Sequence, residues 1–317
     1  MRFGIQTPQY RTDLASLIAT WRAAERLGFR SAWLMDHLYP ILAPPTEPIL
    51  EAWTTLAALA GSTERIRLGI LVAANTFRHP ALVARMAATV DQASRGRLEV
   101  GLGAAWCEVE HVEQGIPFPP LGERLTMLDE ACAVLRGLWE QERLSFSGRY
   151  YRLTNAACAP KPVQTRLPLL LGGQGERRAL KIVARHAQRW NLSGSLATVR
   201  RKREVLAGHC RTLGRDPSDV AVTVRNDFFL TEDRAAADAA IARFAKYARI
   251  DVEEARARVW IGNRRELVAS FRALADAGVD ECILGLGPPY DGAVQEMLGR
   301  VASEIVPEVE GAVAADA

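Results

Sequence analysis

The strongest constraint on the fold is an eightfold alternation of short apolar segments with longer stretches of helical periodicity. The apolar segments are continuous rather than alternating with polar residues, which is typical of parallel strands covered on both faces. Eight strand-then-helix repeats predict an α/β fold, a (β/α)8 TIM barrel. A doubly wound open sheet is the alternative. The eight predicted strands are 2–7, 31–36, 66–74, 96–104, 167–173, 189–194, 220–231 and 280–287.

The length and spacing of the chain favour one domain. Its 317 residues, 49% of them hydrophobic, are enough for one large barrel, and no composition break marks a linker. We therefore predict a single domain over 1–317. The segment 107–166 is longer than an ordinary βα unit, and "FSGRYYRLTNAACAPKPVQ" within it is typical of a hairpin and loop. This predicts an insertion between the fourth and fifth strands, on the side of the barrel that builds the site.

Composition excludes several classes of function. The net charge is only +3 and basic residues are interleaved with acidic ones, so no nucleic-acid patch is expected. The five cysteines are scattered and never form C-x-x-C, which argues against zinc sites and disulfides and predicts a reduced, cytoplasmic protein. We expect no signal peptide, and no apolar run in the sequence is long enough for a membrane helix.

The carboxyl ends of barrel strands carry the chemistry in this fold. Here they offer small residues, amides and tryptophans, with no cluster of metal ligands and no lysine for a Schiff base. This set predicts a binding surface for a flat organic cofactor and no metal. The predicted site residues at these ends are Gln6, Asp36, His37, Asn75, Gly103, Ala104, Ala105, Trp106, Gly172, Gly173, Gln174, Gly175 and Trp190.

Two glycine-containing stretches have different interpretations. "GLGAAW" at 101–106 lacks the third glycine of a dinucleotide fingerprint and follows the fourth strand, so we interpret it as bare backbone against a planar ring. "LLLGGQGERRALK" ends a strand and starts a helix at once, which predicts an anion site at residues 172–176, with Arg177 and Arg178 able to add charge. An ordinary tight turn is the alternative.

The Asp36-His37 pair is a candidate for proton transfer, with the carboxylate orienting the imidazole. A hydrogen-bonded His without a chemical role is the alternative. Among the tryptophans, Trp53 and Trp106 are expected on the substrate side together with Gln6, although a buried core position is the alternative.

The residues also resemble a known family. "SAWLMDHL", "LGILVAANTFRHPALVARMAATVDQASRGRLEVGLGAAWCEVE", "GIPFPPLGERLTMLDEACAVLRGLW", "SFSGRYYRL" and "CAPKPVQTRLPLLLGGQGERRALKIVARHAQRWN" are similar to the bacterial luciferase-like monooxygenase superfamily, and within it to the F420-dependent oxidoreductases. The resemblance is dense over 2–214 and looser beyond.

The resemblance implies a TIM barrel, a homodimer, and coenzyme F420 or FMN in the barrel mouth. It implies a bulge with a non-prolyl cis peptide at Leu71–Val72 that supports the ring, and a phosphate on the turn from Gly172 to Glu176. It also gives the proton-transfer role to His37. One departure concerns the sugar-phosphate dehydrogenases of the superfamily, in which a Glu follows the strand-four glycines. Trp106 stands there instead, which argues against sugar-phosphate oxidation and for a more apolar pocket.

Three functions remain open at this point. The first is hydride transfer between F420 and a small organic substrate. The second is an FMN-dependent monooxygenase that receives reduced flavin from a partner reductase. The third is a non-catalytic barrel that binds flavin, which predicts no turnover with any electron donor.

Overall fold

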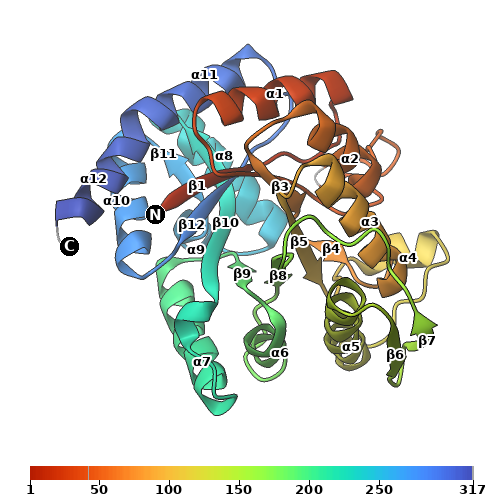
Figure 1. Cartoon of the computed structure of the whole chain (residues 1–317). Helices are drawn as coiled ribbons and strands as arrows, with labels where there is room; N and C mark the ends of the chain where they lie inside the picture. The colour runs from red at the N-terminus through yellow and green to blue at the C-terminus, as the bar shows by residue number, and fades with distance from the viewer. Residues whose placement is uncertain (42, 316–317) are drawn as a thin grey trace.

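A computed structural model describes residues 1–41 and 43–315. Its parallel strands run in the order β1, β2, β3, β5, β8, β9, β10 and β12, and β12 pairs with β1 to close the ring. Helices surround this ring (Figure 1). The predicted (β/α)8 barrel is confirmed, and the open sheet is excluded because the strand order is closed.

The barrel strands coincide with the eight predicted segments, and two short strands, β4 and β11, extend the sheet at β5 and β10. The strands are β1 (Arg2–Gln6), β2 (Ser31–Leu34), β3 (Arg67–Ile70), β4 (Ala73–Ala74), β5 (Leu98–Gly103), β6 (Leu144–Ser147), β7 (Arg152–Ala156), β8 (Leu169–Gly172), β9 (Arg189–Leu192), β10 (Ala221–Leu230), β11 (Trp260–Gly262) and β12 (Glu281–Gly285). The α-helices are α1 (Leu14–Arg26), α2 (Ala52–Ser62), α3 (Pro80–Ala93), α4 (Glu108–Glu113), α5 (Leu121–Glu140), α6 (Ala179–His186), α7 (Leu196–Thr212), α8 (Arg234–Ala248), α9 (Val252–Ala257), α10 (Arg264–Asp276), α11 (Gly292–Arg300) and α12 (Val306–Ala315).

Local sequence signals set the ends of several helices. Asp13 and Ser195 accept hydrogen bonds from the first turns of α1 and α7, and Asn263 forms a capping box with Glu266 in α10. Gly28 follows α1 with φ +84°, a left-handed conformation that glycine adopts without a steric penalty. Asp13, Ser195 and Asn263 therefore mark where three helices begin, and Gly28 marks where α1 ends before β2.

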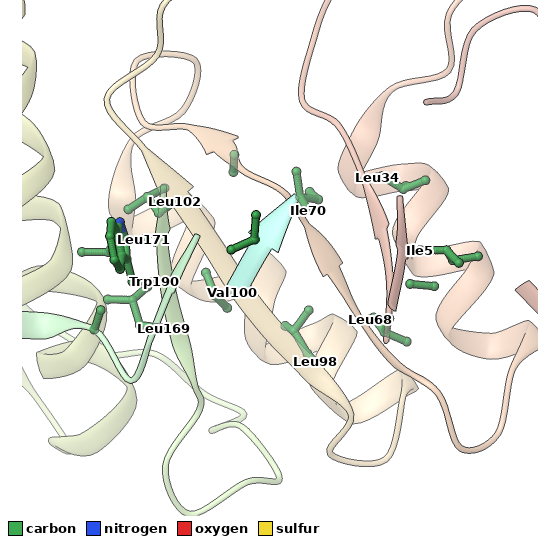
Figure 2. Close-up of a cluster of buried hydrophobic side chains, with 14 of the residues drawn as sticks. Ile5, Leu34, Leu68, Ile70, Leu98, Val100, Leu102, Leu169, Leu171 and Trp190 are labelled. Carbon is green, nitrogen blue, oxygen red and sulfur yellow. The ribbon is translucent and has the colours of Figure 1, made fainter. Parts of the chain in front are cut away.

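The main hydrophobic core lies between the strands and the helices. Figure 2 shows part of it, in which side chains of neighbouring strands lie side by side, including those of Leu98, Val100 and Leu102 from β5. Strands β2, β5, β9 and β12 are buried along their whole length. Burial on both faces explains why most residues of these strands are apolar, and polar exceptions such as Arg189 and Glu281 are buried as well.

The barrel interior changes in character from bottom to top. At the amino-terminal end, Arg189 forms ion pairs with Glu99 and Glu281, all of them buried. Above them Trp33, Leu170 and Ile283 form an apolar cluster, with Leu71 and Val72 packed against it. The interior is therefore a filled core, and only its carboxyl-terminal end is available for a site.

The predicted insertion is present between β5 and β8. It contains the short helix α4, the barrel helix α5 and an antiparallel hairpin of β6 and β7, where the hairpin was expected. Glu130 of α5 accepts hydrogen bonds from the amides of Arg149, Tyr150 and Tyr151, which fixes the hairpin to the barrel wall. No helix within the described residues has the length and apolar character needed to cross a membrane.

Candidate active site

The mouth of the barrel is organised around a bulge that follows β3. The Leu71–Val72 peptide bond is cis, as the resemblance led us to expect. The Leu71 carbonyl accepts a hydrogen bond from Gln6 Nε2 (3.0 Å), and the Leu71 amide donates to the Leu34 carbonyl (2.8 Å). Both bonds come from neighbouring strands, so the bulge is held in place by the barrel itself.

The glycines of β5 and β8 make room for Val72. A Cβ at Gly103 would lie 2.7 Å from Val72 Cγ2, and one at Gly172 would lie 2.9 Å from it. These separations are too short for non-bonded carbons, so both positions need glycine. This corrects our interpretation that Gly103 exposes bare backbone to a ring, because the Val72 side chain occupies the space above it.

A cavity of about 380 Å³ lies at this end of the barrel. Its volume is within the range of small-molecule sites, ~300–1,000 Å³. Predicted residues in its wall are Asp36, His37, Leu71, Val72, Gly103, Ala104, Ala105, Trp106, Gly172, Gly173, Gln174 and Gly175. Residues that the sequence analysis did not name in the wall are Ala73, Ala74, Phe77, Cys107, Glu110, His111, Leu121, Leu125, Ala179, Asn191, Leu192 and Ser193.

His37 is paired with Glu110 at the edge of this cavity. Its Nδ1 lies 2.8 Å from Glu110 Oε2, while Glu110 Oε1 accepts from the amides of Leu38 (2.6 Å) and Tyr39 (3.0 Å). Burial by itself raises the pKa of Glu110, but the hydrogen bonds from His37, Tyr39 and Leu38 outweigh it and the pKa lies below its ordinary value. An ionised carboxylate only accepts hydrogen bonds, so Nδ1 is the donor and carries a proton.

The other ring nitrogen of His37 is free for chemistry. Nε2 makes no hydrogen bond to any residue that the structure describes, and His37 lines the cavity. The Trp106 ring packs edge-on against His37, with 5.5 Å between ring centroids, and is 63% exposed. An imidazole with one nitrogen fixed and the other open can give or take a proton.

The expectation that Asp36 orients His37 is wrong. Asp36 is buried and binds both terminal nitrogens of Arg78 (2.7 and 3.1 Å), and it accepts a hydrogen bond from the Ala74 amide (2.9 Å). Burial raises the pKa of the Asp36 carboxyl, while Arg78 and Ala74 act in the opposite direction. Asp36 therefore anchors the segment after the bulge. Glu110, which lies 73 residues after His37, orients the imidazole instead.

The glycine-rich turn after β8 differs in one respect from the prediction. Helix α6 begins at Ala179, after a turn at 176–178, rather than directly after the glycines. Gly173 has φ +149°, in the region that favours glycine, and Gln174 Nε2 donates to the Ser193 carbonyl (2.9 Å). Gly173, Gln174, Gly175 and Ala179 still line the cavity, and the Leu180 amide of this helix start donates to the Gly175 carbonyl (3.0 Å).

Two residues that we predicted to contact the cofactor do not line the cavity. Trp190 is fully buried against the outer helices, and its Nε1 donates to the Gly173 carbonyl (2.8 Å). Successive residues of a strand face opposite sides, so Asn191 faces the interior and lines the cavity instead. Asn75 is buried, and its side-chain amide donates to the Tyr151 hydroxyl (3.1 Å). Asn75 therefore anchors the inserted hairpin.

Three further predicted residues lie outside the cavity wall. Glu176 forms ion pairs with Arg201 (2.5 Å) and Lys202 (2.9 Å) of α7, so its carboxylate faces that helix. Trp53 belongs to the hydrophobic core, the alternative that we left open. Gln6 is buried and supports the bulge from below.

Potential metal ligands are also close together. One donor atom from each of His37, Cys107 and Glu110 lies within 4.8 Å of the others. Burial, followed by the charge of Glu110, raises the pKa of the Cys107 thiol, which keeps it protonated. Since Glu110 is already engaged by His37 and two amides, we interpret His37 and Glu110 as a proton-transfer pair.

Comparisons with known proteins agree with this geometry. A family model described as luciferase-like monooxygenase matches residues 1–301. The chain is 36% identical to an F420-dependent glucose-6-phosphate dehydrogenase of Intrasporangium calvum over 188 residues, 58% of this chain and 54% of that protein.

Solved structures share the whole fold. An F420-dependent secondary alcohol dehydrogenase in complex with an F420-acetone adduct superimposes with a TM-score of 0.86 at 22% identity, covering 97% of this chain and 98% of that one. A type II Baeyer-Villiger monooxygenase of Pseudomonas putida in complex with FMN gives 0.73 at 18% identity, covering 98% and 99%.

Proposed function

Because the chain belongs to the luciferase-like monooxygenase family, we propose that it uses the deazaflavin coenzyme F420 to transfer a hydride to or from a small organic substrate. The observation that supports this most directly is the His37–Glu110 pair, whose free nitrogen faces a cavity with a cofactor-sized volume. The relative at 36% identity that carries a functional name is F420-dependent, which favours F420 over FMN.

The residues of the cavity fit a planar ring with a phosphate-bearing tail. Leu71 and Val72 give an apolar floor, and Ala104 and Ala105 leave one wall without bulky side chains. The Gly173 turn and the start of α6 supply backbone amides, with the positive end of a helix dipole behind them. In the proposed complex, the first four residues hold the ring and the turn holds the phosphate.

The chemistry then divides between coenzyme and protein. When bound, F420 supplies or accepts the hydride. His37 Nε2 gives the accompanying proton to a substrate oxygen, or takes it in the reverse direction. Glu110 is a positioning residue, since it holds Nδ1 and leaves Nε2 as the open ring nitrogen. Arg124 holds the cavity wall by donating to the Ala104 (3.0 Å) and Ala105 (2.5 Å) carbonyls.

A second candidate is an FMN-dependent monooxygenase that takes reduced flavin from a partner reductase. It is supported by the fold shared with an FMN-bound monooxygenase.

Matched fluorescence titrations of the purified protein with F420 and with FMN test the proposal. Tight F420 binding with weaker FMN binding supports hydride transfer. Tight FMN binding with weak F420 binding replaces it with the monooxygenase. Failure to bind either coenzyme contradicts both and leaves a barrel without its expected cofactor.

Three further expectations stay predictions. The chain is expected to act as a single domain, to form a homodimer, and to work in the cytoplasm. Light scattering of the purified protein tests the homodimer, and its monomer mass is 34.8 kDa.

A further inference from the structure

A second and larger cavity opens at the same end of the barrel. Its volume is about 1,280 Å³, against 380 Å³ for the cavity beside His37. It lies over the ends of β1, β10 and β12, between α8 and α11. Apolar side chains dominate its lining, among them those of Tyr10, Phe228, Phe244, Tyr247, Leu286 and Met297.

The side chain of Gln6 connects residues that line the two cavities. Gln6 donates to the Leu71 carbonyl, which belongs to the smaller cavity, and accepts a hydrogen bond from Arg225 Nε (2.7 Å), which belongs to the larger one. Tyr247 of α8 lines the larger cavity, and burial raises its pKa.

Most arginines around the larger cavity form ion pairs with acidic side chains of the protein itself. Arg225 forms an ion pair with Asp227 (2.6 Å), Arg11 pairs with Glu47, and Arg300 pairs with Glu304 (3.1 Å). Arg243 lies on the exposed side of α8, where water can solvate it. The wall therefore offers a large apolar surface and no buried cluster of free cations, which suits an apolar molecule better than a sugar phosphate.

We propose that this larger cavity is the substrate subsite, and that it takes the non-reacting part of a bulky, largely apolar ketone or the corresponding secondary alcohol. The inference rests on the proposed function. Ketone reduction takes up one hydride at the carbonyl carbon, supplied by reduced F420, and one proton at the oxygen, supplied by His37. The products are the alcohol and oxidised F420, and the reverse reaction oxidises the alcohol.

The test uses a small and a bulky ketone, acetone and 4-phenylcyclohexanone, with reduced F420. Ala240 of α8 lines the larger cavity and is absent from the wall of the smaller one, so Ala240→Trp fills the subsite alone. Ala239 is its exposed neighbour on the same helix, and Ala239→Trp is the matched control.

We expect the wild-type protein to favour 4-phenylcyclohexanone in kcat/KM by about tenfold or more. Ala240→Trp should lower kcat/KM for this ketone by a similar factor and leave acetone within about twofold. Ala239→Trp should change neither ketone. Equal kcat/KM for the two ketones in the wild type, or no ketone-specific effect of Ala240→Trp, would overturn the inference.

A binding measurement separates this inference from the proposed function. Isothermal titration calorimetry with 4-phenylcyclohexanone needs neither coenzyme nor turnover. If F420 fails to bind but the ketone binds the wild type and not Ala240→Trp, the proposed function fails and the subsite stands. If F420 binds and acetone turns over, while the ketone shows no binding that Ala240→Trp removes, the subsite alone fails.

Discussion

At the residue scale, the site depends on a contact between two distant side chains. His37 follows β2 and Glu110 lies in α4, yet Nδ1 and Oε2 are 2.8 Å apart. Glu110 also accepts two backbone amides from the chain just after His37. These three hydrogen bonds fix both the position of the imidazole and the nitrogen that carries its proton.

Replacing His37 tests its proton-transfer role. In His37→Ala we expect turnover with F420 to fall by ~10²–10⁴-fold, the usual contribution of general acid–base catalysis. The Kd for F420 should change little, because the bulge and the glycine turn are untouched. Steady-state kinetics and fluorescence titration measure the two quantities. Turnover equal to that of the wild type would return His37 to a purely structural role.

Replacing Glu110 gives a pH-dependent stability difference. Its pKa is lower in the folded protein than in the unfolded chain, so its stabilising contribution is complete above the ordinary Glu pKa of ~4.3 and is lost as pH falls through the folded-state value. Glu110→Gln should therefore be less stable than wild type at pH 7 by about 1.5–3 kcal/mol, and the difference should shrink below about pH 4. Urea unfolding at several pH values measures it.

Glu108→Gln is the matched control for this change. Glu108 is an exposed acid in the same helix, and its replacement should alter the unfolding free energy by less than about 0.5 kcal/mol at any pH. A Glu110→Gln difference that does not change with pH would show that the carboxylate charge contributes nothing to the fold.

At the scale of elements, one strand end and the following turn form the proposed phosphate site. Trp190 of β9 holds the Gly173 carbonyl, and Gln174 is tied to the Ser193 carbonyl, so the turn after β8 is fixed by the neighbouring strand. Helix α6 starts at Ala179, and this residue lines the cavity. The site is thus a joint product of β8, β9 and α6.

Substitutions at Gly173 separate backbone geometry from charge. Gly173→Glu should raise the Kd for F420 by about tenfold or more, because a carboxylate would repel the phosphate at the helix start. Gly173→Ala carries the same cost of a side chain at φ +149° without the charge, and is the control. Fluorescence titration of both variants measures the effect. Equal affinities in the two variants would place the phosphate elsewhere.

At the scale of the whole molecule, barrel closure brings buried charges from separate strands together. Arg189 of β9 contacts Glu99 of β5 and Glu281 of β12, and Ser31 of β2 donates to Glu281. Arg30 and Arg67, which are partly exposed, reach the same carboxylates from the edge. Closure therefore pairs opposite charges that would be costly to bury one at a time.

Removing the central cation should destabilise the barrel. In Arg189→Met we expect the free energy of unfolding to fall by about 3 kcal/mol, because two buried carboxylates lose their most buried partner. Arg211→Met on the exposed side of α7 should change it by less than about 0.5 kcal/mol. Urea denaturation compares the two. Equal unfolding free energies would mean that Arg30 and Arg67 are sufficient.

The sequence pattern by itself predicted the barrel and the glycine turn, and the resemblance to a known family implied the place of the bulge. Strand and helix periods, caps and stop signals are local, and eight of them in succession leave few ways to close a sheet. Only the tertiary structure decided which of two successive strand residues faces the barrel interior. It also decided which acidic side chain forms the hydrogen bond with His37. In β9 the polar Arg189 and Asn191 alternate with the apolar Trp190 and Leu192. A barrel strand is covered on both faces, so this alternation does not show by itself which pair faces the interior. Glu110 pairs with His37 only because the fold brings the chain after β5 beside the chain after β2, a contact that no spacing along the sequence encodes.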